Sequence, residues 1–245
     1  MKVLAFDTAT RATTAALWDT DGIDPPREAR DDPDPGERPG HARYLLPLIS
    51  ELLERSGTGW EEIETLAVGV GPGTFTGLRI GIATARALSR ARRIPLVGVS
   101  TLESLALGPR LDPRLPADID TLLSVIDARR GEVFAASWPV DDGPPGPATP
   151  RSFGPRAVRP EWLATNITGL GGRVIAVGDG AVEFREVLEP SGASIPADDS
   201  ELHRVSATNH CRLASGKRAG RPDEVSPEYL RLPDAKIAHR DTDKQ

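Results

Sequence analysis

The sequence predicts an α/β protein made of two related lobes, and three observations support this class. An apolar run ending at Asp7 passes through a polar turn into Ala15-Ala16-Leu17-Trp18, and the pattern recurs in a run that ends at Asp127 and returns as Ala135-Ala136-Ser137-Trp138. Residues 66–99 are predicted to form a strand, a glycine loop, a helix and a second strand. The 245 residues suffice for two lobes. Two unrelated hairpins, each with a turn-favouring Asp, are the alternative explanation of the repeat.

In the first lobe we expect strands at 2–7 and 12–18. Residues 24–39 are rich in Pro, Asp, Arg and Glu, which predicts a mobile surface loop. From His41 to Ser56 apolar residues recur at helical spacing, which predicts a helix with a broad apolar face and a kink at Pro47. The apolar residues of this helix are Ala42, Leu45, Leu46, Leu48, Ile49, Leu52 and Leu53.

The remaining elements follow the same patterns. We expect a strand at 66–70, a loop at 71–77, a helix at 78–92 and a strand at 96–99. Further strands are expected at 121–127, 132–138 and 173–177, with Pro-rich loops at 139–150 and 154–160. A last helix at 203–219 precedes a short ordered stretch at 227–231 and a loose charged tail from Lys236. The expected domains are a first lobe at 1–103 with the helix 203–219 packed back on it, a second lobe at 104–202, and a flexible tail at 232–245.

Composition limits the classes of function. The formal net charge of −6 argues against a protein that coats nucleic acid with its own basic surface, so work on RNA would need a basic partner. The single Cys211 excludes an internal disulfide and a thiolate metal site. The apolar run before Asp7 is too short for a signal peptide, and no stretch approaches membrane-spanning length. We therefore expect a cytoplasmic protein that does not contact membranes.

The glycine loop Gly71-Pro72-Gly73-Thr74-Phe75-Thr76-Gly77 is the strongest local signal for a binding site. It leaves a strand and enters a helix, so free backbone amides and the helix dipole, with Thr74 or Thr76 as N-cap, would favour an anion such as phosphate. The alternative is a tight turn in which glycine allows strand and helix to approach closely. It is not a Walker loop, because no Gly-Lys-Ser/Thr follows.

Two hairpin tips carry further candidate groups. Asp7, Thr8 and Thr10 could hold a phosphate or a hydrated cation, although such residues often bond only their own turn. Asp127 and Glu132 could act as acid and base, but the two arginines between them make a charged hairpin tip the simpler interpretation. Gly178-Asp179-Gly180 could contact a nucleotide or be a plain turn. The four histidines lack metal-ligand spacing, and no hydrolase motif is present.

Several longer blocks resemble the TsaB (YeaZ) family, the dimerisation subunit of the bacterial machinery that makes threonylcarbamoyladenosine in transfer RNA. The blocks are residues 4–10, 41–49, 69–81, 127–134 and 227–231, in family order and across nearly the whole chain. The resemblance implies an ASKHA (actin-like ATPase) superfold of two RNase-H-like lobes with mixed sheets flanked by helices. A compact third strand would then be expected within 24–39, and the Pro/Asp-rich composition there puts that strand in doubt.

The resemblance also implies a role. Family members are inactive paralogues of TsaD, bind it through the helix with the Leu-Leu-Pro motif, form homodimers when alone, and work with TsaE. TsaD transfers threonylcarbamoyl to N6 of the adenosine beside the anticodon. TsaD holds its metal with a pair of histidines, of which only His41 remains here, so no metal and no catalytic residue is expected in this chain. ATP or ADP and a divalent metal are expected in the partner or at the shared interface.

The resemblance supplies one set of site residues, and the glycine loop and Asp7 hairpin described above supply a second. The expected partner or dimer interface comprises His41, Tyr44, Leu45, Leu48, Ile49, Leu52, Thr74 and Phe75. Contacts to a nucleotide or phosphate are expected from Asp7, Thr8, Thr10, Gly71, Gly73, Thr74 and Arg79. The alternative function is a small-molecule kinase or ATPase of the same superfold, with the Asp7 hairpin and the glycine loop as its site.

Overall fold

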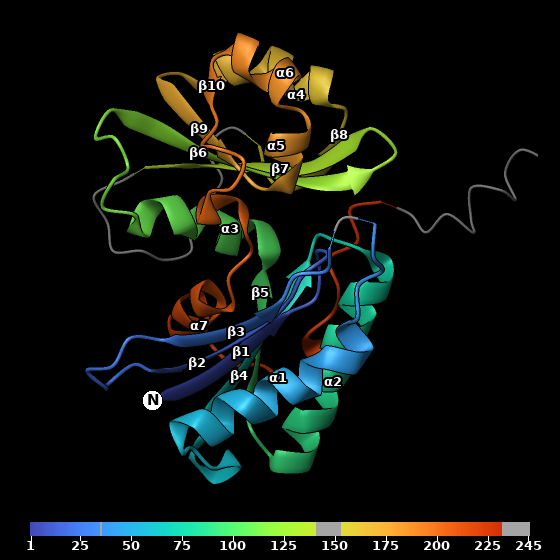
Figure 1. Cartoon of the computed structure of the whole chain (residues 1–245), viewed down its shortest axis with the longest axis vertical. Helices are drawn as coiled ribbons and strands as arrows, with labels where there is room; N and C mark the ends of the chain where they lie inside the picture. Colours follow the sequence, from blue (N-terminus) through green and yellow to red (C-terminus); the bar gives the residue numbers. More distant parts are fainter. Residues whose placement is uncertain (35, 141–152, 232–245) are drawn as a thin grey trace, which may run out of the picture.

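The computed structural model describes residues 1–34, 36–140 and 153–231. Two lobes are stacked, each built on a five-stranded mixed sheet with helices on both faces, and helix α3 (Thr101–Leu111) lies between them (Figure 1). Within these described ranges, no helix combines the length and the apolar character needed to cross a membrane. The two-lobed α/β class expected from the sequence is confirmed.

The first sheet has the order β3-β2-β1-β4-β5. Its strands are β1 (Lys2–Asp7), β2 (Thr13–Asp19), β3 (Arg27–Asp31), β4 (Thr65–Gly71) and β5 (Leu96–Ser100). The central strand β1 pairs antiparallel with β2 and parallel with β4. Side chains alternate between faces along a strand, so Leu4 and Phe6 join one core while Val3 and Ala5 join the core on the opposite face.

Three helices cover the first sheet. Helices α1 (His41–Ser56) and α2 (Phe75–Arg92) lie on the Leu4 side, and α7 (Ala207–Ser215) lies on the Val3 side (Figure 1). The predicted bounds of α1 are confirmed, and the helix continues through Pro47. It ends at Gly57, whose φ of 62° is the left-handed conformation that glycine adopts without steric cost.

The second sheet repeats the first. Its strands are β6 (Ile119–Arg129), β7 (Glu132–Pro139), β8 (Arg156–Val158), β9 (Arg173–Val177) and β10 (Ala193–Ser194). Their order, β8-β7-β6-β9-β10, matches β3-β2-β1-β4-β5 strand for strand. The duplication predicted from the repeated hairpin is therefore confirmed. The helices of this lobe are α4 (Pro160–Ile167), α5 (Asp179–Glu183) and α6 (Arg185–Leu188). In the two lobes together, short 3-10 turns occupy Trp60–Glu62, Thr168–Leu170, Glu189–Ser191, Glu201–His203 and Pro222–Glu224.

The prediction of a loop without a third strand in the 24–39 tract is wrong. Strand β3 pairs antiparallel with β2, with Thr13 opposite Asp31 and Leu17 opposite Arg27. Charged residues suit this position because β3 is a half-exposed edge strand. Glu28 also has a specific role: its carboxylate accepts hydrogen bonds from Ser206 Oγ at 2.5 Å and from the first amides of α7, so it caps a distant helix.

Two further expectations need correction. The last helix was expected at 203–219, but His203 closes a 3-10 turn and α7 covers only Ala207–Ser215. The tract 154–160, expected to be a loop, contains β8 and the first residue of α4, where proline is tolerated because its missing donor is not needed. Most of the loop expected at 139–150 and the tail expected at 232–245 lie outside the described residues.

Candidate functional site

The glycine loop between β4 and α2 is locked against the β1–β2 hairpin. Thr74 N donates to Ala9 O at 2.7 Å, and a Cβ on Gly73 would lie 2.3 Å from the same oxygen. A Cβ on Gly77 would lie 1.9 Å from Thr8 O. Glycine is therefore required for close backbone approach, as in the tight-turn alternative. The predicted N-cap is confirmed, since Thr74 Oγ1 accepts from Gly77 N at 3.3 Å.

Asp7, at the end of β1, is fully buried and fully engaged. Thr101 Oγ1 donates to its Oδ2 at 2.8 Å, Ala9 N donates to its Oδ1 at 2.6 Å, and His210 Nε2 lies 2.9 Å from Oδ2. Burial alone would raise the pKa of Asp7, but the neighbouring His210 and these donors outweigh it and hold the pKa below its usual value. A Cβ at Gly69 would lie 1.8 Å from Oδ2, so the carboxylate fills its pocket completely.

Ser104, His210 and Asp7 form a chain that sequence analysis did not predict. Ser104 Oγ lies 2.9 Å from His210 Nδ1, which gives the order of groups found in serine hydrolases. All three residues are fully buried, and Ser104 Oγ donates to Ser206 O at 3.1 Å. No substrate can reach the hydroxyl in this arrangement, so the chain of contacts ties α3 and α7 to β1.

The structure separates the residues expected to contact phosphate. Asp7 and Thr8 are sealed inside the first lobe, and Thr8 Oγ1 donates to Gly77 O at 2.7 Å. The expectation that they contact a ligand is therefore wrong for this conformation. Thr10 is half-buried and lines a separate interlobe cavity of about 210 Å³ together with Asp179. The Asp179 side chain is exposed, yet the atoms crowded around its carboxylate remove enough water to raise its pKa to about 6.

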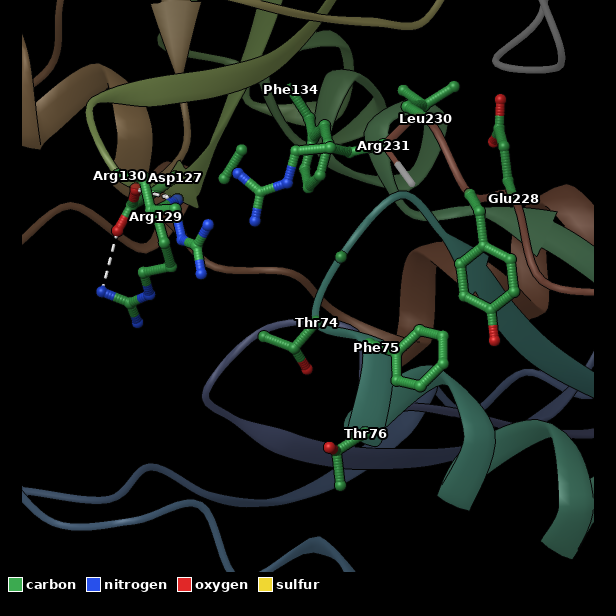
Figure 2. Close-up of a pocket in the computed structure, with 13 residues that line it drawn as sticks. Thr74, Phe75, Thr76, Asp127, Arg129, Arg130, Phe134, Glu228, Leu230 and Arg231 are labelled. Carbon is green, nitrogen blue, oxygen red and sulfur yellow. Dashed lines mark hydrogen bonds and ion pairs between the residues drawn. The ribbon is translucent and has the colours of Figure 1, made fainter. Parts of the chain in front are cut away.

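A larger cavity of about 490 Å³ lies between the lobes, and we call it the aromatic–arginine cavity (Figure 2). Three segments that are distant in the sequence meet there: the N-terminus of α2, the β6–β7 hairpin and the chain after α7. Gly73 and Thr74 line it, whereas Gly71 is buried beside it. The full lining is Gly73, Thr74, Phe75, Thr76, Asp127, Ala128, Arg129, Arg130, Phe134, Glu228, Tyr229, Leu230 and Arg231.

Two aromatic rings and an arginine form one wall of this cavity. The rings of Phe75 and Tyr229 pack with centroids 5.2 Å apart. The guanidinium of Arg79 lies 3.6 Å from the Phe75 centroid, and its Nε donates to Tyr229 Oη at 3.1 Å. Arg79 is thus engaged on the outer side of the ring pair. Sequence analysis did not assign a role to Tyr229, although it belongs to the block 227–231.

Half of the expected partner interface lies inside the first lobe. His41, Leu45, Ile49 and Leu52 are at most 5% exposed, and His41 Nδ1 lies 2.9 Å from Thr13 Oγ1. Burial lowers the pKa of His41. The prediction that these four side chains contact a partner is corrected, because the sheet already covers them.

The opposite sides of α1 and α2 face solvent. Leu46 is 50% exposed and Phe75 is 36% exposed, while Tyr44, Leu48 and Thr74 are half-buried. We call this surface the α1–α2 face; its exposed small and apolar residues are Ala42, Leu46, Phe75, Ala83 and Ala87, with Tyr44, Leu48 and Ile80 at its margins. Leu46 was not assigned to the interface from sequence. Its position one residue from the buried Leu45, about 100° around the helix, was the available signal.

Within the described part of the chain, no three His, Cys, Asp or Glu side chains are grouped so that they could hold a metal ion. Cys211 is buried on the α7 side of the sheet, where burial raises the pKa of its thiol. The two places in the described structure where a partner or ligand could bind are the α1–α2 face and the aromatic–arginine cavity.

Known proteins resemble this chain along almost its whole length. The family model described as TsaD, tRNA N6-adenosine threonylcarbamoyltransferase, matches residues 37–140. The tRNA threonylcarbamoyladenosine biosynthesis protein TsaB of Escherichia coli is 31% identical over 94% of this chain and 95% of that protein. TsaB of Bacillus subtilis is 26% identical, with coverages of 80% and 81%. A crystal structure of a Pseudomonas aeruginosa protein similar to peptidase YeaZ matches with a TM-score of 0.75 and 26% identity, over 94% of this chain and 99% of that one. The identity to the E. coli protein over nearly the full length of both chains shows that this chain belongs to the TsaB family.

Proposed function

We propose that this chain is a non-catalytic subunit that binds a TsaD protein through the α1–α2 face. The bound TsaD, working with TsaE, would then transfer threonylcarbamoyl to N6 of the adenosine beside the anticodon. The observation that carries the proposal is the exposure of Leu46 and Phe75 beside the small residues Ala42, Ala83 and Ala87. Small residues let a partner helix approach closely, and apolar side chains exposed together mark an interaction surface.

The size of this face fits an exchangeable interface. Leu46 is 50% exposed and Phe75 is 36% exposed, so burying either one completely gains about 0.5–1.5 kcal/mol, in proportion to the roughly 1.5–3 kcal/mol for a whole side chain. Several such gains reach only the lower end of the roughly 4–15 kcal/mol that association costs. We therefore expect a homodimer of modest affinity that gives way to the heterodimer with TsaD on the same surface.

The non-catalytic part of the proposal is supported by the burial of Asp7. Its carboxylate is fully enclosed and engaged by Thr101, Ala9 and His210. A kinase or ATPase of the same superfold, the alternative function, would have used this carboxylate in an open cleft. In the proposed complex, ATP or ADP and the divalent metal are bound by the partner or at the shared interface, and tRNA contacts the assembly.

The test is a pair of charge insertions on the α1–α2 face. Leu46→Asp and Ala83→Glu each place a carboxylate in the proposed interface, and neither side chain contributes to the core. The control is Leu111→Asp, at an exposed leucine that ends α3. Titration calorimetry with TsaD from the same organism should show at least tenfold weaker binding for both face variants and unchanged binding for the control. Wild-type affinity in both face variants would refute the proposal.

A further inference from the structure

Within the described residues the chain passes between the lobes at three places: through helix α3 and the residues after it, between β10 and α7, and in the segment that follows α7. The last of these segments begins in the first lobe, where Val225 joins the core under α2 and Arg86 Nη2 donates to Val225 O at 2.8 Å. Glu228 N then donates to Val70 O at 2.7 Å, at the end of β4. The segment is thus anchored on the first lobe up to residue 228.

The next three residues cross to the second lobe. Tyr229 packs on Phe75 at the start of α2, Leu230 packs against the core between α3 and the second sheet, and Arg231 Nη1 donates to Glu132 Oε2 at 3.1 Å. Glu132 begins β7, directly after the tip of the hairpin. Residues 228–231 form one wall of the aromatic–arginine cavity, and residues of the two lobes line the rest of it (Figure 2).

We propose that residues 228–231 act as a clasp that sets the arrangement of the two lobes and links it, through Tyr229 and Phe75, to the α1–α2 face. Three features support this. The cavity leaves room for the lobes to approach or separate. The Arg231–Glu132 pair is only about one-third exposed, so solvent and salt screen it less than a fully exposed ion pair. Phe75 belongs to both the cavity and the proposed docking face, so a partner that contacts its ring also contacts the clasp. The link to docking rests on the proposed function, whereas the clasp itself does not.

The hairpin that receives the clasp has a tight turn. Arg130 and Gly131 are its two central residues, and their φ values of 59° and 71° are those favoured in two-residue hairpin turns. Arg129, with φ 63°, lies at the register shift between Asp127 and Arg129. The turn and the bulge fix the start of β7, where Glu132 accepts the hydrogen bond from Arg231.

The clasp is testable without a partner, by measuring the distance between spin labels on the two lobes. Glu61→Cys and Thr165→Cys place labels at exposed sites in the first and second lobes. The native Cys211 is buried with a raised thiol pKa and does not compete for the label. We expect one narrow distance distribution for the wild-type background and a broader, shifted one for Arg231→Ala. The double variant Arg231→Glu with Glu132→Arg should restore the narrow distribution.

The matched control is Arg55→Ala, which removes an exposed ion pair with Glu51 within one lobe and should leave the distribution unchanged. A wild-type distribution in Arg231→Ala would overturn the clasp, as would broadening in the Arg55→Ala control.

A second arm adds TsaD, with complex formation followed by mass. The distance should shift on binding in the wild-type background, and the shift should be lost in Tyr229→Ala although the complex still forms. An equal shift in Tyr229→Ala, or no shift in the wild-type complex, would overturn the link to docking. Failure of the wild-type protein to bind TsaD would instead refute the proposed function, while the partner-free measurement still decides the clasp.

Discussion

The adjacent residues Leu45 and Leu46 provide the sharpest test of how α1 divides its apolar side chains between core and surface. Leu45 is 2% exposed and packs against the first sheet, while Leu46 is 50% exposed. Leu→Ala at a fully buried site costs about 2–5 kcal/mol, because transfer free energy and a cavity add together. At Leu46 half of the side chain is already in water, so the same substitution should cost less than about 1 kcal/mol.

Chemical denaturation of the two single variants measures this difference directly. A domain of ordinary stability, about 5–15 kcal/mol, should still fold with Leu45→Ala, so both values are accessible. We expect the denaturation midpoint to fall clearly for Leu45→Ala and hardly at all for Leu46→Ala, with equal slopes. Partner affinity should show the opposite ranking, since only Leu46 lies on the α1–α2 face. Equal costs at the two positions would refute the assignment of Leu45 to the core.

Three further predictions concern single groups. Asp179 has a pKa of about 6 in the folded chain against about 4 when unfolded, so the stability of the fold decreases as pH rises from 4 to 6. Because the Asp179 side chain is exposed, solvent screening keeps this loss small. Asp179→Asn should therefore become slightly more stable relative to wild type above pH 6, and a constant difference across pH 3–8 in denaturation curves would contradict this. Gly77→Ala should cost about 3 kcal/mol or more, because its Cβ would lie 1.9 Å from Thr8 O, whereas Gly216→Ala, with no neighbour nearer than 4.0 Å, should be tolerated in the same thermal assay. Arg93→Gly should stabilise the end of α2 by up to about 1 kcal/mol, because Arg93 has φ 57°; a lower melting temperature would show that the arginine side chain matters more than its backbone strain.

Features encoded by neighbouring residues were predictable from the sequence. The bounds of α1 follow from an apolar period that begins at His41 and stops before the C-cap Gly57. The N-cap of α2 follows from the position of Thr74 in the glycine loop that precedes the helix. The repeated hairpin predicted the duplicated topology, because the same alternation of apolar strand, Asp and turn specifies the same pairing of strands in both lobes.

Features made by residues distant in the sequence were not predictable. Strand β3 is a charged edge strand, and one of its residues, Glu28, caps α7 some 180 positions later. Composition alone cannot distinguish such a strand from a loop. The enclosure of Asp7 depends on Thr101 and His210, which come from α3 and α7. The apolar arc on α1 was visible, but which half of it faces the sheet depends on how the helix packs.

The masses of the species formed on mixing this chain with TsaD decide whether the two proteins pair through the α1–α2 face. Native mass spectrometry of each protein alone and of the mixture is sufficient. We expect the mixture to contain a complex of one copy of each chain, formed at the expense of the homodimer, because both assemblies use the α1–α2 face. Persistence of the homodimer beside unbound TsaD, or a complex in which the homodimer remains intact, would contradict it.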